Sequence, residues 1–210
     1  MNDTAESPLL LIVSAPSGAG KSTLCRKMLE RNAAMAYSVS CTTREPRGEE
    51  KDGEAYYFLD EAAFRRKIEE DAFLEYARVH GAWYGTLRST VVSALRNGRD
   101  VVMDIDVQGA AQIREAARHA APDDPIRRGY VDVFIEPPSM DELKRRLTGR
   151  GEDAAEVIER RLKKARQEMA ARDQYAYRIV NESVDDSVGV MEAIATAEHH
   201  RVRNGTTGGR

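Results

Sequence analysis

Short apolar runs alternate with helical patterns along most of this 210-residue chain. Three runs, Leu9–Val13, Val101–Asp106 and Tyr130–Ile135, are short and closely bounded by turn or acidic residues, as buried strands are. A helical pattern follows each run, and a last strand is predicted at Tyr177–Val180 before a closing helix near Ser187–Glu198. Because such alternation produces right-handed crossovers, the pattern predicts an α/β fold with a parallel sheet flanked by helices.

Two longer stretches interrupt this alternation and are expected to be excursions from the sheet. The second, roughly Ser139–Arg172, is predicted to be helical and opens with a capping box formed by Ser139 and Glu142. The first, roughly Ser40–Asn97, holds several predicted elements. These are strands at Tyr37–Ser40, Ala55–Leu59 and Phe73–Ala77, a helix capped by Asp60, a turn at Gly81–Thr86 and a helix ending near Asn97.

The segment SAPSGAGKST, Ser14–Thr23, joins the first strand to a helical pattern that begins at Leu24. Glycines let successive backbone N–H groups turn toward one point, and a helix start adds unpaired donors and a positive dipole. A polyphosphate fits there, with Lys21 reaching the β- and γ-phosphates and the Ser22 hydroxyl on Mg²⁺. The segment therefore predicts an enzyme that uses a nucleoside triphosphate.

One residue departs from the strict phosphate-loop pattern, which requires glycine where this chain has Ala15. The alternative interpretation is an ordinary glycine-rich turn before a helix. Such a turn would need neither the lysine nor the hydroxyl that follow, so the phosphate-loop interpretation is favoured.

A carboxylate lies within an apolar strand pattern in the first excursion. Period-two alternation over Phe73–Ala77 puts Glu75 on the same side as Phe73 and Ala77. A carboxylate among apolar neighbours needs a partner, because burying it unpaired is costly. Glu75 is thus a candidate for function, and the alternative that it lies on an exposed sheet face stays open.

Two aspartates end the second buried run. Asp104 and Asp106 share a face of the strand, and the carboxyl ends of parallel strands face the ligand crevice. A carboxylate at that edge near a phosphate loop would hold a metal ion or its water shell. The alternative is that a strand-end aspartate caps the helix that follows.

Arginines in two loops are candidate anion ligands. Arg44 and Arg47 follow hydroxyl residues and form a fork of donors, although a solvated basic loop is an equal alternative. Arg150 lies between two glycines, which indicates a charge able to close onto a ligand.

Composition limits the classes of function. A net charge of −3 argues against a general nucleic-acid-binding protein. Two cysteines and four histidines show no metal-ligand spacing, and the acidic N-terminus resembles no signal peptide. No apolar run reaches the length of a membrane span, so we expect a cytoplasmic protein with neither nucleic-acid nor membrane partners. The oligomeric state is left open.

Several motifs, in order, resemble the guanylate kinase family over about Leu9–Glu198: SAPSGAGKST, SVSCTTREPRGEE, GEAYYF, FLEYARVHGAWYGT, VVMDIDVQGA, VFIEPPSMDELKRRLTGRG and YRIVNE. The resemblance implies a P-loop nucleoside monophosphate kinase fold in which ATP and GMP, with Mg²⁺, give ADP and GDP. dGMP is an expected second acceptor, and the implied role is guanine nucleotide metabolism and GMP recycling. The implied organisation is one domain with a core of 8–39, 98–138 and 173–199, a GMP-binding region of 40–97, a lid of 139–172 and an unstructured tail of 200–210.

The resemblance also implies residue roles. The nucleotide donor would be bound by Ala15, Pro16, Ser17, Gly18, Ala19, Gly20, Lys21, Ser22, Thr23, Arg146 and, near the adenine, Asn181. The GMP phosphate would meet Ser40, Arg44, Arg47, Tyr56 and Tyr84, and guanine would meet Glu75, Thr86 and Asp106. Ser22 and Asp104 would hold magnesium, and Lys21, Arg44, Arg150 and Arg161 would be catalytic.

The implied specificity agrees with hydrogen-bond chemistry. An ionised Glu75 only accepts hydrogen bonds, and guanine offers N1–H and a 2-amino group side by side. Adenine lacks the 2-amino group and would leave the carboxylate unpaired in a dry site, whereas the Thr86 hydroxyl suits guanine O6.

Two rival functions remain at this stage. A related kinase could use the same phosphate loop on another phosphorylated acceptor, such as ribose 1,5-bisphosphate, but a sugar phosphate has no guanine edge for Glu75 and Thr86. Guanylate-kinase-like domains of scaffold proteins bind other proteins instead, but they typically lack a working phosphate loop, whereas Lys21 and Ser22 are present here.

Overall fold

The computed structural model describes residues 7–79, 81–148 and 155–202. Arg150, the glycines beside it and most of the predicted tail lie outside these ranges. No helix within them combines the length and apolar character that crossing a bilayer requires.

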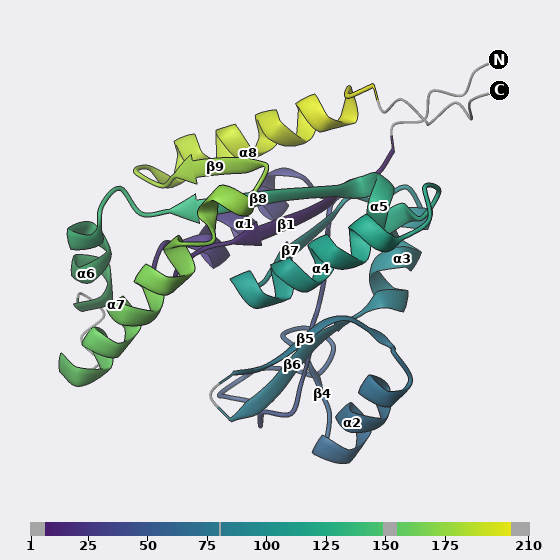
Figure 1. Ribbon diagram of the computed structural model, residues 1–210, viewed down its shortest axis with the longest axis horizontal. Helices are drawn as coiled ribbons and strands as arrows, with labels where there is room; N and C mark the ends of the chain where they lie inside the picture. The colour runs from purple at the N-terminus through teal and green to yellow at the C-terminus, as the bar shows by residue number, and fades with distance from the viewer. Residues whose placement is uncertain (1–6, 80, 149–154, 203–210) are drawn as a thin grey trace.

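A five-stranded parallel sheet forms the centre of the molecule (Figure 1). Its order is β2-β7-β1-β8-β9, and every adjacent pair is parallel. The strands are β1 (Leu10–Ser14), β2 (Ala36–Tyr37), β7 (Val101–Asp104), β8 (Tyr130–Glu136) and β9 (Tyr177–Val180). The predicted parallel sheet is confirmed, and the three continuous apolar runs are its three inner strands.

The inner strands are largely apolar because helices cover both faces of the sheet, and the buried Asp132 within β8 pairs with Arg114 at 2.7 Å. Along the first strand, Leu9, Leu11 and Val13 pack in one core, and Leu10 and Ile12 pack in the other. The first core is covered by α1 (Lys21–Arg31) and α8 (Val184–His199), and the second by α3 (Arg88–Arg96), α4 (Val107–His119) and the short α5 (Pro125–Gly129). The predicted surface loop at Ala121–Pro125 leads into α5, whose Ile126 is fully buried.

A second, four-stranded sheet lies below the central one in Figure 1 and is called the excursion sheet here. Its order is β4-β3-β6-β5, and β6 runs antiparallel to both neighbours. The elements are β3 (Cys41–Thr42), β4 (Tyr57–Phe58), β5 (Phe73–Val79) and β6 (Ala82–Leu87), with α2 (Glu61–Glu69) capped by Asp60 as predicted.

Three predictions for this region are wrong. The predicted turn at Gly81–Thr86 is strand β6, which pairs with β5 along its length. The predicted strand at Tyr37–Ser40 is divided between the end of β2 and the approach to β3, because the chain leaves one sheet for the other there. A register shift between Phe73 and Glu75 breaks the expected alternation, so Phe73 packs with Phe64 and Glu75 faces elsewhere.

Two helices, α6 (Met140–Thr148) and α7 (Ala155–Met169), form a hairpin with its own small core of Leu143, Leu147, Ile158, Leu162 and Ala165. The Ser139 hydroxyl accepts from the Glu142 N–H at 3.0 Å, as the capping box predicts. The Glu142 carboxylate does not complete the box. It binds the guanidinium groups of Arg145 and Arg146 at 2.8 Å, which lowers its pKa to about 2.

Candidate active site

The phosphate loop lies between β1 and α1, at the carboxyl edge of the central sheet. Gly18 and Gly20 have φ angles of 93° and 97°, in the left-handed region that favours glycine, and Gly20 starts α1. Ala15 is only 6% exposed and packs in the core beneath the loop. A methyl group is therefore accommodated where the strict motif has glycine.

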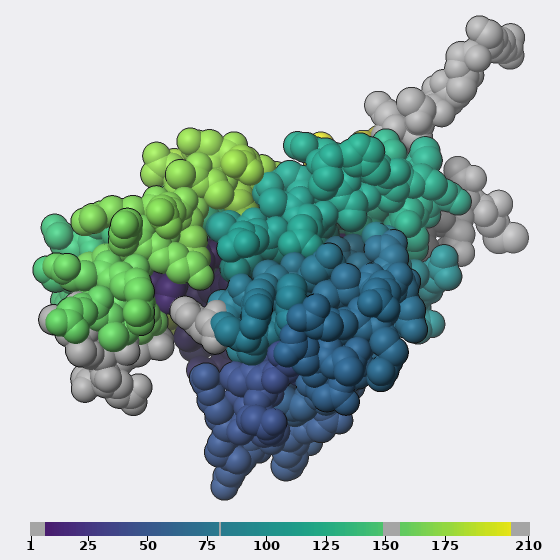
Figure 2. Space-filling view, turned by 60° about the horizontal axis from the view of Figure 1, so that its bottom comes forward, coloured from purple at the N-terminus to yellow at the C-terminus, as the bar shows by residue number. Residues whose placement is uncertain are grey.

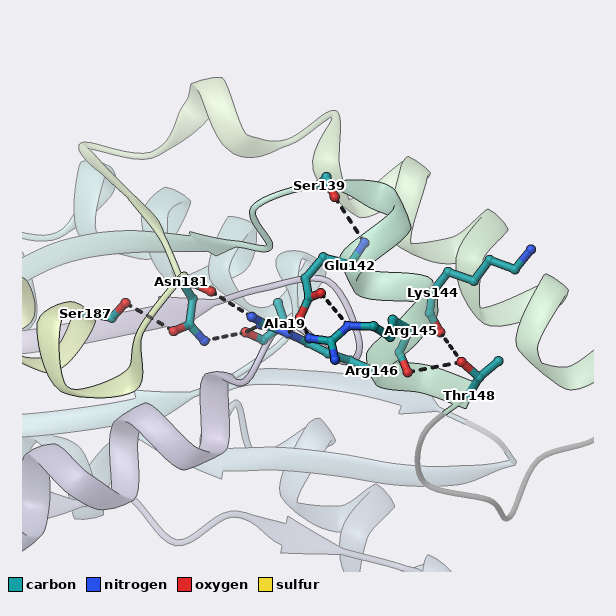
Figure 3. A network of polar contacts seen from close by, with 9 residues as sticks. All are labelled: Ala19, Ser139, Glu142, Lys144, Arg145, Arg146, Thr148, Asn181 and Ser187. Carbon is teal, nitrogen blue, oxygen red and sulfur yellow. Dashed lines mark hydrogen bonds and ion pairs between the residues drawn. The ribbon is translucent and has the colours of Figure 1, made fainter.

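The loop is braced from behind by Asn181, which is 2% exposed. The side-chain NH2 group of Asn181 donates to the Ala19 carbonyl at 2.7 Å, and its side-chain oxygen accepts from the Ser187 hydroxyl (Figure 3). Arg146 reaches the same place from α6 and donates to the Ala19 and Asn181 backbone carbonyls (Figure 3). The Asn181 side chain is thus used inside the protein, and this placement does not support the predicted contact with adenine.

Lys21 and Asp104 form the polar centre of the site. The Lys21 ammonium lies 2.6 Å from an Asp104 carboxylate oxygen and donates to the Ile105 carbonyl at 2.6 Å. Asp106 has a different role, because its carboxylate accepts from the N–H groups of Gln108 and Gly109 and caps α4. The cap that was an alternative for a strand-end aspartate therefore applies to Asp106, and Asp104 is the carboxylate beside the phosphate loop.

Arg44 is held in a defined orientation on the excursion. Its guanidinium makes two hydrogen bonds with the Glu50 carboxylate, at 2.9 and 3.0 Å, and lies 5.3 Å from the centre of the Tyr56 ring. The bonds with Glu50 raise the pKa of Arg44 and lower that of Glu50. Arg47 is exposed and binds Glu50 through its backbone, since its N–H donates to the Glu50 carboxylate and its carbonyl accepts from the Glu50 N–H.

Glu75 is buried, with 6% of its surface exposed. One carboxylate oxygen accepts from the Thr86 hydroxyl at 2.7 Å, and Thr86 in turn lies 3.1 Å from the Ser40 hydroxyl. Burial raises the pKa of Glu75 to about 7, although the hydrogen bond from Thr86 acts in the opposite direction. The alternative of an exposed sheet face for Glu75 is therefore wrong.

One face of α7 meets the phosphate loop at Ser17. The Arg161 guanidinium donates to the Ser17 hydroxyl at 3.1 Å, and the Glu168 carboxylate accepts from the Ser17 N–H at 3.2 Å. Lys164 lies between them along the helix and is 3.5 Å from Glu168. Sequence reasoning missed Lys164 and Glu168, although their spacing from Arg161, three and seven residues, places all three on one helix face.

A cleft of about 430 Å³ is lined by most of these groups. Figure 2 shows the purple N-terminal segment at the bottom of a recess between the green α6–α7 hairpin and the blue excursion. Of the predicted site residues, the following line the cleft: Ala15, Pro16, Ser17, Gly18, Gly20, Lys21, Ser22, Thr23, Ser40, Tyr56, Glu75, Tyr84, Asp104, Asp106 and Arg161. Arg44 and Thr86 contact lining residues, Tyr56 and Glu75, without lining the cleft themselves. Ala19, Arg47, Arg146 and Asn181 do not line it, whereas Ala77 and Val79 are lining residues that were not predicted.

The fold and the cleft define a class of protein. The class is the phosphate-loop nucleotide kinases. Its parts are all present: a phosphate loop on a parallel sheet, a lysine paired with a strand-end aspartate, and a separate excursion that holds a buried carboxylate and an oriented arginine.

Comparisons with known proteins give the family within that class. The family model "Guanylate kinase" matches residues 7–198. The guanylate kinase of Paramagnetospirillum magneticum is 45% identical over 190 residues, which cover 90% of this chain and 85% of that protein. The guanylate kinase of Clostridium tetani is 42% identical over 197 residues, covering 94% and 89%. The crystal structure of guanylate kinase from Anaplasma phagocytophilum has a TM-score of 0.73 at 32% identity, covering 94% of this chain and 89% of that one. This chain belongs to the guanylate kinase family.

Proposed function

We propose that this protein transfers the γ-phosphoryl group of ATP to GMP, giving ADP and GDP. The observation that carries the proposal is the Glu75–Thr86 pair, a purine-reading carboxylate and hydroxyl held 2.7 Å apart beside the cleft that also contains the phosphate loop. Guanine N1–H and its 2-amino group supply the two donors that an ionised Glu75 requires. We place the reaction in the cytoplasm, whose reducing conditions suit the buried free thiols of Cys25 and Cys41.

The acceptor specificity is tested directly with a coupled assay for ADP formation. With ATP and Mg²⁺ present, GMP is expected to be phosphorylated on the order of 10³-fold more efficiently, as kcat/KM, than AMP, UMP or CMP, since a site built to bind specific donors rejects nucleotides that lack them. Equal rates with all four nucleotides would contradict the proposal. Turnover of ribose 1,5-bisphosphate without GMP turnover would favour the rival sugar-phosphate kinase.

The residues of the cleft divide between the two nucleotides. We assign the phosphates of ATP to the phosphate-loop amides and Lys21, and the phosphate of GMP to Arg44. Tyr56 and Tyr84, whose rings pack edge to face with their centroids 5.8 Å apart, would lie beside the GMP phosphate. Arg161, with Arg146 and Arg150, would neutralise charge on the transferred group from the lid.

The donor set beside Lys21 fits magnesium. Ser22 offers a hydroxyl and Asp104 a carboxylate at the edge of the cleft, and Mg²⁺ prefers such oxygen ligands while taking only one or two from protein. Bound there, the ion would supply positive charge against the β- and γ-phosphates. Without it, Lys21 and Asp104 neutralise each other across 2.6 Å.

The chemistry asks for alignment and charge neutralisation rather than for a general base. An oxygen of the GMP phosphate is itself the nucleophile, and Arg44 holds it in line with the γ-phosphorus. Lys21 and the lid arginines offset the negative charge as the bond to ADP loosens. The α6–α7 hairpin, already in contact with Ser17, would exclude the water that could otherwise hydrolyse ATP.

The raised pKa of Glu75 predicts a pH dependence. Below pH 7 the Glu75 carboxyl is largely protonated, so it presents a hydrogen-bond donor to the N1–H and 2-amino donors of guanine. We therefore expect kcat/KM for GMP to rise with pH and to level off above about 7. The profile is measured at saturating ATP. In Glu75→Gln the inflection near 7 should disappear, which separates it from titration of the GMP phosphate; an unchanged inflection would contradict the assignment.

A further inference from the structure

Gly109, in the first turn of α4, lies directly against the Glu75 carboxylate. A Cβ at position 109 would stand 2.8 Å from Glu75 Oε2, 3.3 Å from Cδ and 3.5 Å from Cγ. The contact at 2.8 Å is shorter than real Cβ atoms show, so any side chain at 109 must displace something. Among the described residues, the three heavy atoms nearest to such a Cβ all belong to the Glu75 side chain.

The backbone of β5 cannot easily provide the missing space. One turn further along α4, the Gln112 side chain accepts from the Tyr76 N–H at 3.1 Å and donates to the Tyr76 carbonyl at 2.8 Å. These two bonds hold β5 against the helix next to Glu75. The carboxylate, at the end of a flexible side chain, is therefore the part that would move.

Movement of this carboxylate changes what it can bind. Its other oxygen accepts from Thr86, which fixes the plane of the group between β6 and α4. A methyl group at 109 would push Oε2 away from the helix, so that either the Thr86 bond or the aim of the carboxylate into the cleft is lost.

We propose that Gly109 is a specificity-determining position, where the absence of a side chain provides the space in which Glu75 takes the orientation that reads guanine. The inference rests on the proposed role of Glu75 in GMP recognition. It predicts that one added methyl group at 109, which is too small to disturb the fold, weakens the use of GMP and not that of ATP.

The test compares Gly109→Ala with Gly189→Ala. Both glycines lie in α-helices, and a Cβ at 189 meets nothing within 4 Å. Alanine favours helix at either position. For Gly109→Ala we expect KM for GMP to rise at least about tenfold, as when a hydrogen bond to a charged group is not made, while KM for ATP stays near the wild-type value and Tm does not fall. Gly189→Ala should leave both KM values unchanged and raise Tm by about 2–4 °C at most, through helix propensity alone.

Two results would overturn the inference. One is an unchanged KM for GMP, and the other is a lower Tm together with equal rises in KM for ATP and KM for GMP. A double variant keeps the test decisive if Gly109→Ala folds poorly. In the Glu75→Ala background the methyl group has no carboxylate to displace, so adding Gly109→Ala should neither lower Tm nor weaken the calorimetric Kd for GMP. A further loss in the double variant would show that the clash is not with Glu75.

Failure of the proposed function gives a different result. If Glu75 does not read guanine, Glu75→Gln alone will leave KM for GMP unchanged. If Glu75→Gln raises KM for GMP and Gly109→Ala does not, only the inference about Gly109 fails.

Discussion

Lys21→Ala is expected to lower kcat for GMP phosphorylation by about 10²- to 10³-fold, the typical effect of removing one preorganised donor to transition-state charge. Lys21 lies at the start of α1, within 2.6 Å of both Asp104 and the Ile105 carbonyl, so its ammonium is fixed at the edge of the cleft before any ligand binds. Steady-state kinetics with each substrate varied would measure the effect, and kcat should fall more than KM for GMP changes.

Lys27→Ala is the matched control for this substitution. Lys27 lies on the same helix and pairs at the surface with Asp185, 3.3 Å away, so its removal should leave kcat within about twofold of wild type. Thermal unfolding of both variants is needed, because Lys21→Ala leaves a largely buried Asp104 without its cation. Near-normal kcat in a folded Lys21→Ala variant would contradict the phosphate-loop account.

Glu75→Gln is expected to lower kcat/KM for GMP on the order of 10³-fold with little effect on KM for ATP. The glutamine amide would present a donor to guanine donors, and a site whose buried polar groups are mismatched loses this much discrimination. GMP and AMP kinetics on one preparation give both the loss and the change in selectivity.

The same substitution is expected to stabilise the protein above pH 7. Glu75 has a raised pKa in the folded state, so between about 4.5 and 7 the folded chain binds more protons than the unfolded chain and stability falls as pH rises. The rise in the Glu75 pKa from 4.5 to about 7 lowers the free energy of unfolding above pH 7 by, as an upper limit, on the order of 3 kcal/mol. Glu75→Gln removes this cost, and Tm should rise by several degrees at pH 8 and by much less at pH 5.

Glu69→Gln on the exposed side of α2 serves as the control, because it removes one negative charge from the same excursion without touching the cleft. It should change neither GMP kinetics nor the pH dependence of Tm. A Glu75→Gln variant that loses stability at pH 8 would show that the carboxylate is not a buried, destabilising charge.

Much of the fold was predictable because the strongest patterns are also the most buried. The runs around Leu11, Val102 and Val133 are largely apolar on both faces because helices cover both faces of the sheet. The prediction of a turn at Gly81–Thr86 was wrong because glycines at both ends of that segment suggest a turn. The strand β6 forms there through pairing with β5 and β3, which local sequence does not encode.

The site was predictable where a motif fixes the geometry and not where contacts span the chain. Lys21 follows from its place in the phosphate loop, but nothing local separates Asp104, which faces Lys21, from Asp106, which caps α4. The contact between Glu168 and Ser17 joins residues 151 positions apart. The placement of Asn181 behind Ala19 is equally non-local, since it depends on how β9 and α8 pack against the phosphate loop.

The strand β1 contributes alternate side chains to both cores and also carries the phosphate loop at its carboxyl end. Its amides are hydrogen-bonded to neighbouring strands on each side, so this segment cannot open without disrupting the cooperative unit that contains both cores. The α6–α7 hairpin packs on a small cluster of its own and is joined to the phosphate loop by the hydrogen bonds of Arg146, Arg161 and Glu168, so we expect it to open locally at a lower free energy than β1. Local opening of the hairpin would therefore leave the phosphate loop in place, because the strand that carries the loop persists until the whole chain unfolds.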